Sequence, residues 1–253
     1  MPRPVDLYDA LSDSYDTMIA WEPRLRNELP FFRKVFAEIQ ARRVLDMACG
    51  TGQHAIAFAK EGYAVTAVDL SLPMIEQARA NAVKAGVDVH LAVAGFGQAR
   101  RLIGQGFDAV TCLGNSLPHL IKRLELVASL KDMRAVLRPG GILVIQNRNY
   151  DRVWARKIRF MPVDARVIGG REALFLRFMD FHRKTLTFNI LQLFKEDTRW
   201  QCRVDSTRLR PIFQRELEED LRKAGFCNMT FYGDYQFNEW REEAEDTIAL
   251  AWR

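Results

Sequence analysis

The sequence lacks several features that define other classes of protein. No apolar run approaches the roughly 20 residues that cross a membrane, and residues 1–6 lack the apolar core of a signal peptide, so we expect a cytoplasmic protein away from the membrane. The four cysteines are scattered and form no C-x-x-C pair, and we expect no metal site. There is also no internal repeat or low-complexity tract, which argues against a solenoid or a disordered chain.

The sequence also has no large excess of charge of one sign. Against 37 Lys and Arg residues stand 32 Asp and Glu residues, which leaves a net charge of +5. We interpret Arg-rich segments such as 152–159 as a solvated face, so nucleic acid is not an expected partner; an RNA-binding face is the alternative. An anionic small substrate would also be attracted by this charge. The 48% apolar content over 253 residues allows a globular protein with a substantial core.

The most informative stretch predicts a strand, a glycine turn and a helix over residues 42–61. Its first six residues form a mostly apolar run that is typical of a buried strand. Gly50 and Gly52 permit backbone angles that side chains forbid, and they leave the main chain open to a ligand. The next strand ends at Asp69, about 20 positions past the turn, where a carboxylate can accept hydrogen bonds from two ribose hydroxyls. The unit is therefore predicted to bind a nucleoside.

The residues around the glycines indicate which nucleoside it is. Ala55 stands where a dinucleotide fingerprint accepts glycine or alanine, so spacing alone does not exclude NAD. Asp46, at the end of the first strand, suits a ligand with a cationic ammonium and would repel a pyrophosphate. Together with the two glycines and Asp69, it resembles the S-adenosylmethionine site of the class I methyltransferases. A strand–helix turn that binds nothing is the alternative.

Two further predicted strands end in loops at the same sheet edge, where ligands bind in open α/β sheets. One strand is followed by Gly95 and Phe96, and the Phe96 ring could stack on an adenine. The other is followed by Gly114, Asn115 and His119, which fall where cofactor and substrate should meet. This loop lacks the Asn/Asp-Pro-Pro-Tyr/Phe sequence with which many nucleic-acid base methyltransferases grip a flipped base.

Arg148 emerges at this edge after the next strand. Its guanidinium offers a bidentate fork for a carboxylate, and a surface ion pair with Asp151 is the alternative.

The N-terminal segment is rich in aromatic residues and carries Tyr8, Tyr15, Arg24 and Arg26. An arm that folds over the cofactor would use such residues to shield a sulfonium and to pin a carboxylate. Simple packing of a cap onto the sheet is the alternative for the phenylalanines of this segment.

The order of elements predicts an α/β fold with a mostly parallel sheet. Helical spacing falls on residues 5–18, 24–40 (interrupted at Pro30), 53–61, 72–85, 122–137 and 213–226. Strand patterns fall on residues 43–47, 64–68, 88–93, 107–113, 142–147, 173–181, 185–194, 200–204, 229–232 and 247–252. We divide the chain into an N-terminal helical arm (1–40), a Rossmann-like cofactor core (41–151), an inserted antiparallel sheet that forms a lid and substrate wall (152–212), and a helix and strands that complete the core sheet (213–253).

Paired motifs resemble those of the glycine and glycine/sarcosine N-methyltransferase family. In that family, Cys-Leu-Gly-Asn-Ser at a strand end is followed shortly by His-Leu, as in residues 112–116 and 119–120 here. The family also has Arg-Asn-Tyr-Asp after Arg-Pro-Gly-Gly and a strand, as in residues 148–151 and 138–141 here. The resemblance runs from the N-terminal arm through Asp151. It implies a seven-stranded, mostly parallel Rossmann-like sheet with helices on both faces.

By this resemblance, the cofactor is S-adenosylmethionine, which leaves as S-adenosylhomocysteine. Asp69 would bind its ribose and Ala48 would approach its methionine moiety. Asn115 and Arg148 would hold the carboxylate of an amino-acid acceptor. The cofactor site would comprise Tyr8, Arg26, Asp46, Ala48, Gly50, Gly52, Asp69, Leu70, Gly95, Phe96, Leu113, Gly114 and His119.

Two departures from the family pattern affect the pocket. Gly95 and Phe96 replace an Asn-Trp pair beside the adenine, and the family's tyrosine-rich loop has no match in residues 152–166. An amine or amino acid other than glycine is therefore a plausible acceptor. Arg177 and Arg183, in the predicted hairpin, are alternative substrate anchors.

The leading hypothesis is methyl transfer to the amine of a small carboxylate-bearing molecule, with positioning as the main source of rate. His119 is a candidate to take the proton of an ammonium substrate, although an amine that binds neutral needs no base. Methylation of oxygen or of RNA with the same cofactor, and a non-catalytic cofactor sensor, are the alternatives. The resemblance also allows a homo-oligomer formed through the N-terminal arm.

Overall fold

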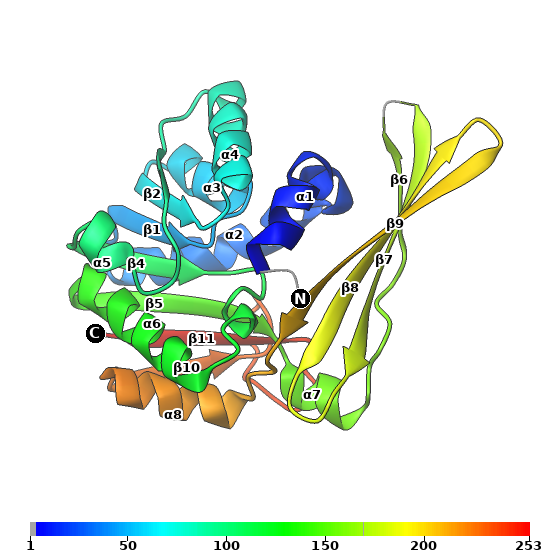
Figure 1. Ribbon diagram of the computed structural model, residues 1–253. Helices are drawn as coiled ribbons and strands as arrows, with labels where there is room; N and C mark the ends of the chain where they lie inside the picture. Colours follow the sequence, from blue (N-terminus) through cyan, green and yellow to red (C-terminus); the bar gives the residue numbers. More distant parts are fainter. Residues whose placement is uncertain (1–3, 169) are drawn as a thin grey trace.

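The computed structural model describes residues 4–168 and 170–253, so the first three residues of the predicted arm and residue 169 of the predicted insert lie outside the described residues. Two β-sheets and an N-terminal arm organise the chain (Figure 1). The strands of the larger sheet are β1 Arg43–Met47, β2 Ala64–Asp69, β3 His90–Val93, β4 Phe107–Cys112, β5 Leu137–Arg148, β10 Asn228–Tyr232 and β11 Asp246–Trp252. They are arranged in the order β10-β11-β5-β4-β1-β2-β3.

Only β11 breaks the parallel arrangement of this seven-stranded sheet, because it runs antiparallel to both β5 and β10. The predicted fold class is therefore confirmed. The structure has these helices: α1 Pro4–Met18, α2 Trp21–Glu38, α3 Gln53–Lys60, α4 Leu72–Ala85, α5 Ala99–Leu102, α6 Arg123–Val136, α7 Tyr150–Ala155, α8 Gln214–Ala224 and a 3₁₀ turn at Leu117–His119. The sequence patterns had not indicated the short helices α5 and α7 or the 3₁₀ turn.

Helices cover both faces of the sheet because alternate residues of each strand point to opposite sides. Leu143 and Ile145 of β5 belong to a buried cluster with α6 and α8. Val144, between them, belongs to a second cluster with α2 and α3. The central strands are thus apolar on both faces, which is why they read as continuous hydrophobic runs.

Pro30 does not interrupt α2, contrary to the prediction. The helix continues from Trp21 to Glu38 with Pro30 inside it. A proline in a helix removes one backbone hydrogen bond and costs about 3 kcal/mol. The residues that follow, Phe31 and Phe32, are buried in the cluster that α2 forms against the sheet, and this burial offsets the cost.

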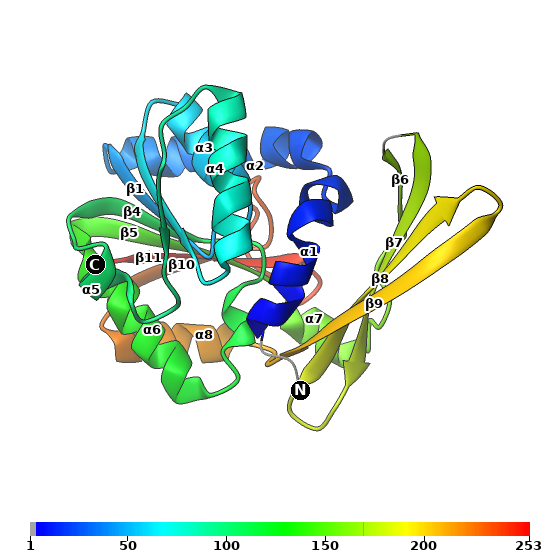
Figure 2. The ribbon, with the colours of Figure 1, turned by 45° about the horizontal axis from the view of Figure 1, so that its top comes forward.

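The second sheet is antiparallel and has four strands, β6 Asp164–Ile168, β7 Arg171–Phe181, β8 Leu186–Glu196 and β9 Arg199–Leu209, in chain order. The sequence predicted only three strands here. It missed β6, whose residues alternate between partial and full exposure at the sheet edge. Figures 1 and 2 show this inserted sheet projecting away from the core, with α1 between the two. Leu7, Leu11 and Met18 of α1 pack on its inner face.

Within residues 4–168 and 170–253, no helix is long and apolar enough to cross a membrane. The same part of the chain has no group of three or more His, Cys, Asp or Glu side chains placed to hold a metal ion. All four cysteines are free thiols, of which Cys112 is buried and Cys202 and Cys227 are exposed.

Candidate functional site

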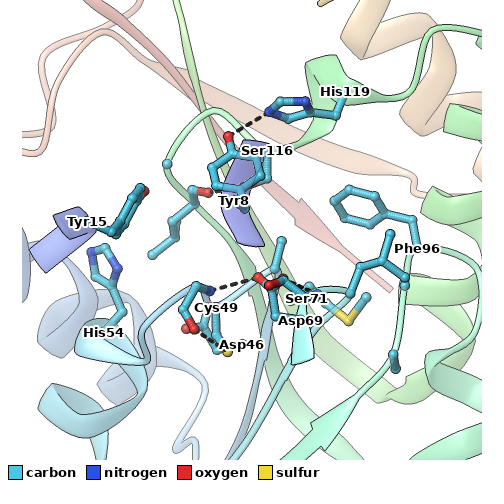
Figure 3. Close-up of a pocket in the computed structure, with 18 of the residues that line it drawn as sticks. Tyr8, Tyr15, Asp46, Cys49, His54, Asp69, Ser71, Phe96, Ser116 and His119 are labelled. Atoms are coloured by element: carbon cyan, nitrogen blue, oxygen red, sulfur yellow. Dashed lines mark hydrogen bonds between the residues drawn. The ribbon is translucent and has the colours of Figure 1, made fainter. Parts of the chain in front are cut away.

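A cavity lies at the carboxyl ends of β1, β2, β3 and β4 and is closed on one side by the N-terminal arm (Figure 3). Of the residues predicted to bind the cofactor, all except Arg26 and Gly52 line it. Tyr15, Trp21, Arg24 and Ser71 line it as well. The structure therefore brings the glycine turn, three strand-end loops and the arm together around one space.

Asp69 holds the glycine turn and also faces the cavity. The Gly50 N–H donates to its Oδ2 at 2.8 Å, and the Ser71 N–H donates to its Oδ1 at 2.9 Å. These two bonds fix the orientation of the carboxylate, and each oxygen keeps a further lone pair for a ligand hydroxyl. Burial raises the pKa of Asp69 above its usual value.

Gly52 does not line the cavity, and the absence of its side chain serves the packing of two helices. It has φ +77° at the start of α3, and a Cβ placed on it would lie 2.9 Å from Cβ of Ala78 in α4. The glycine thus permits both the left-handed backbone and the close approach of α3 to α4. The cofactor role predicted for Gly52 stays a prediction beside this structural one.

Asp46 presents an unsatisfied carboxylate oxygen at the end of β1. Its Oδ1 accepts a 2.7 Å hydrogen bond from Thr111 Oγ1, while its Oδ2 is buried without a hydrogen-bond partner in the described part of the chain. Burial raises the pKa of Asp46 to about 6. A buried carboxylate oxygen without a donor is costly unless a ligand supplies one, so this position fits a cationic group such as an ammonium.

Leu70, Gly95 and Phe96 form one apolar wall of the cavity. Leu70 is 54% exposed, which is unusual for a leucine at a strand end. A Cβ on Gly95 would lie 3.2 Å from Cδ1 of Leu70, so the absence of a side chain at Gly95 leaves room for that leucine. The wall can take one face of a planar, weakly polar ring.

The arm reaches across the cavity to the loop after β4. The Tyr8 hydroxyl and His119 Nε2 are hydrogen-bonded at 2.8 Å, and the rings of Tyr8 and Tyr15 meet edge to face. Burial lowers the pKa of His119 to about 4, so the imidazole is neutral near pH 7. Its Nδ1 is buried and has no partner among the described residues.

Arg26 does not reach the cavity, contrary to the prediction. Its side chain is 76% exposed and pairs with Glu22 one turn back along α2, at 2.7 Å. Arg24 lines the cavity instead, where its guanidinium lies over the Trp21 ring and donates to Glu28 at 2.8 Å. Residues two apart on a helix face different directions, so only one of the two arginines can point inward.

Asp16 locks the arm onto the core, and the sequence analysis missed it. Its carboxylate accepts hydrogen bonds from Trp21 Nε1 at 2.9 Å, Gln53 Nε2 at 3.0 Å and Asn81 Nδ2 at 2.7 Å. Thr51 Oγ1 donates to it as well, at 2.5 Å. These donors come from the arm, the glycine turn and α4, so a single carboxylate ties three segments together at the mouth of the cavity.

Asn115 and Arg148, predicted to hold the acceptor, do not line this cavity. Both polar groups of the Asn115 side chain are used within the chain, because Nδ2 donates to the Tyr150 hydroxyl at 3.0 Å and Oδ1 accepts the Arg148 backbone N–H at 3.1 Å. The Arg148 guanidinium lies 5.8 Å from the Phe188 ring centre on β8. It forms no ion pair in residues 4–168 and 170–253, and Asp151 instead accepts the Gln214 backbone N–H.

The sequence is similar to a known protein family and to several known proteins. Residues 44–141 match a family model described as a methyltransferase domain. The glycine/sarcosine N-methyltransferase of Aphanothece halophytica is 38% identical over 141 residues, which are 56% of this chain and 53% of that protein. The glycine N-methyltransferase of Rattus norvegicus is 39% identical over 122 residues, 44% of this chain and 42% of that protein. The alignments thus span about half the length of these curated relatives.

Solved structures agree on the fold over nearly the whole chain. An S-adenosylmethionine-dependent methyltransferase from Clostridium acetobutylicum has a TM-score of 0.79 and 18% identity, covering 97% of this chain and 98% of that one. The CcbJ methyltransferase from Streptomyces caelestis has a TM-score of 0.78 and 23% identity, covering 97% and 96%. The predicted resemblance to class I methyltransferases and to the glycine N-methyltransferase family is confirmed.

Proposed function

We propose that this chain, which contains a methyltransferase domain over residues 44–141, transfers a methyl group from S-adenosylmethionine to the amine of a small carboxylate-bearing molecule. One observation carries the proposal: two buried charged groups lack a counter-charge among the described residues, namely the Oδ2 oxygen of Asp46 in the cavity and the guanidinium of Arg148 over Phe188. The first suits the ammonium of the cofactor and the second suits the carboxylate of an acceptor.

The residues of the cavity fit the cofactor. Asp69 has lone pairs free for the ribose hydroxyls, and the wall of Leu70 and Phe96 suits the adenine. Arg24 is the arm residue placed to meet the methionine carboxylate, while Asp46 would meet the adjoining ammonium. When bound, S-adenosylmethionine supplies a methyl group already activated on a sulfonium.

The protein then has to align the acceptor and exclude water. Tyr8 and Tyr15 of the arm close the cavity, and their rings would shield a sulfonium. Holding two reactants in line can supply about 7–11 kcal/mol of a reaction barrier. In this proposal, positioning by the arm and by Arg148 is the main source of rate.

Asn115 and His119 take supporting roles in this proposal. Asn115 fixes the backbone of Arg148 through its Oδ1 and contacts Tyr150 through its Nδ2, so it positions the guanidinium. His119 is neutral near pH 7, because burial lowers its pKa to about 4. A pKa this low makes the imidazole a weak base, so in this proposal the acceptor binds as a neutral amine and the Nδ1 atom, which has no partner in the part of the chain that the structure describes, is left for a hydrogen bond.

The names of the relatives support an amino-acid acceptor. The curated relatives of Aphanothece halophytica and Rattus norvegicus are named for methylation of glycine or sarcosine. By the motif resemblance, Asn115, His119 and Arg148 correspond to residues of that family, whereas residues 152–166 depart from the family's tyrosine-rich loop. We infer an acceptor of the glycine and sarcosine type with a differently shaped pocket around it.

A labelled-methyl assay tests the proposal. Purified protein with tritiated S-adenosylmethionine is offered glycine, sarcosine, other α-amino acids, phenols and tRNA in separate reactions. We expect label in an amino acid, lost in Arg148→Met and retained in the matched variant Arg183→Met, which changes an exposed arginine of the β7–β8 turn. Label only in tRNA or phenols, or cofactor binding without turnover on any of these substrates, would reject the proposal.

Localisation and assembly belong to the same proposal. We infer a cytoplasmic protein that associates through the N-terminal arm. The apolar side of α1 is already packed within the chain against Phe175 and Ile190, so the interface would use the other sides of the arm. Light scattering on the full chain and on a variant without residues 1–18 would test this.

A further inference from the structure

The inner face of the inserted sheet carries an arginine that the proposed reaction has not used. Arg177 of β7 lies opposite Ile190 of β8, and it alternates with Phe175 and Met179 on the same side of the strand. Phe175 is buried against α1, and Met179 is buried in the cluster that contains Tyr150. Arg177 therefore points into the space between the inserted sheet and the core.

The charge of Arg177 is only partly balanced there. Its Nη2 donates to Asp164 Oδ2 at 2.5 Å, but Arg166 donates to the other oxygen of the same carboxylate at 3.1 Å. Two guanidiniums thus share one carboxylate, which leaves an excess positive charge. The Nε of Arg177 is buried and has no hydrogen-bond partner in residues 4–168 and 170–253.

Arg148 faces the same space. Its guanidinium lies over Phe188, and Phe188 pairs with Met179, two residues along β7 from Arg177. Burial lowers the pKa of Arg148, and the positive charge of Arg177 lowers it further. Asp246 lies opposite Arg148 on β11, but it accepts a hydrogen bond from Gln146 and forms no ion pair with Arg148 in the described chain. The two arginines therefore repel each other, while Arg148 has no ion pair in the described chain and Arg177 shares its carboxylate with Arg166.

We propose that the acceptor is a small amine with two acidic groups, one held by Arg148 and the second by Arg177. This rests on the proposed function and narrows its substrate class. A single carboxylate would pair with Arg148 and would leave Arg177 and Arg166 with the one carboxylate of Asp164 between them. An amine with two carboxylates would satisfy both, and each guanidinium can bind a carboxylate through two parallel hydrogen bonds.

The experiment compares matched acceptors. Methyl transfer to glycine and sarcosine is measured beside transfer to aspartate, glutamate and iminodiacetate, the last being sarcosine with a carboxylate added to its methyl group. We expect kcat/KM to be at least tenfold higher for one of the dicarboxylic amines than for glycine. Arg177→Met should remove this preference, whereas Arg148→Met should impair both classes. Arg171→Met, on an exposed part of the same strand, is the control.

Binding measurements separate this inference from the proposed function. The same five amines are titrated into the protein saturated with S-adenosylhomocysteine, in the unmodified chain and in Arg177→Met and Arg177→Lys. Tighter binding of a dicarboxylic amine, lost in Arg177→Met and partly kept in Arg177→Lys, supports the inference even if no methyl transfer occurs. Equal or tighter binding of glycine, or an equal effect of Arg177→Met on both classes, overturns it while leaving the methyltransferase proposal intact.

Discussion

The two sheets of this protein differ in how they are buried and in what they carry. The strands of the larger sheet are covered on both faces, and β5 is fully buried from Ile142 to Ile145. The inserted sheet packs only its inner face against the core and the arm, and its outer face exposes Val167, Trp200 and Val204. The larger sheet therefore has little freedom to vary, whereas the inserted sheet can change one face without disturbing the core.

This difference divides the proposed work of the site. The carboxyl ends of strands β1 and β2 of the larger sheet supply Asp46 and Asp69, which face the cavity proposed for the cofactor. The inserted sheet contributes Arg177 and Phe188 to the space beside Arg148, proposed for the acceptor. A fold built this way can keep one cofactor and change its acceptor through the insert. The following predictions test that division.

The largest effect is expected at Asp69. Asp69→Ala removes the proposed partner of both ribose hydroxyls and also the acceptor for two backbone N–H groups. Hydrogen bonds to a charged group contribute about 1.5–3 kcal/mol each, so we expect S-adenosylmethionine to bind at least about 100-fold more weakly by calorimetry.

Asp164→Ala is the matched control, because it removes a carboxylate of the inserted sheet. It should change cofactor affinity less than about threefold, since it lies outside the cavity. If the two variants lose affinity equally, the cofactor site is not confined to the larger sheet and the division fails.

The stability of the two sheets should differ in the same direction. Val144 of β5 is fully buried in the cluster that α2 and α3 form against the larger sheet. Val144→Ala removes two methyl groups from this position and should lower the free energy of unfolding by about 2–3 kcal/mol. Val167→Ala, 72% exposed on the inserted sheet, should change it by less than about 0.5 kcal/mol. Urea denaturation of both variants measures this. Similar losses would mean that the outer face of the insert is covered in solution.

Sequence patterns predict the larger sheet well because its signals are local. A strand buried on both faces gives a continuous apolar run, and Gly50, Gly52 and Asp69 have a spacing set by one strand–turn–helix unit. The insert is harder to predict because its strands alternate between buried and exposed residues. Its β6 strand gave no signal, and its pairing is fixed only by contact with β7.

The arm shows most clearly what the sequence leaves open. The arginine pattern there does not tell whether Arg24 or Arg26 points inward, because that depends on how α2 rotates against the sheet. Asp16 was missed because its partners Thr51 and Asn81 are 35 and 65 residues away and meet it only when the arm docks. Local patterns identify which residue types are present, but docking decides which of them face the cavity.

Asp16→Ala tests how far the arm contributes to the cofactor site. Four donors lose their acceptor, although water can replace part of these bonds when the arm opens. We expect about tenfold weaker S-adenosylhomocysteine binding and faster hydrogen exchange of α1 amides. Asp9 lies in the same helix as Asp16 and accepts one hydrogen bond, from the Ser71 hydroxyl. Asp9→Ala should therefore weaken binding and speed exchange less than Asp16→Ala does. Unchanged exchange of α1 in Asp16→Ala would show that apolar packing alone holds the arm.

The smallest expected effect is a pH dependence of cofactor affinity that comes from Asp46. Burial raises the pKa of Asp46 to about 6 in the free protein, while the charge of His54 and the hydroxyl of Thr111 lower it and the charge of Asp69 raises it. The cofactor ammonium would bind the carboxylate form, so affinity should fall as pH falls through 6, by up to about tenfold per pH unit. His119 does not titrate in this range, because its pKa is about 4.

Calorimetry between pH 5 and pH 7.5 measures this dependence, and binding should release a proton near pH 6. Asp46→Asn should bind more weakly at pH 7.5 and lose most of the pH dependence, whereas any contribution of Asp246, whose pKa burial also raises to about 6, would persist in that variant. A flat profile in the unmodified protein would mean that Asp46 keeps its charge throughout and that its unpaired oxygen does not meet the ammonium. The cationic end of the cofactor would then have to be held by another part of the cavity.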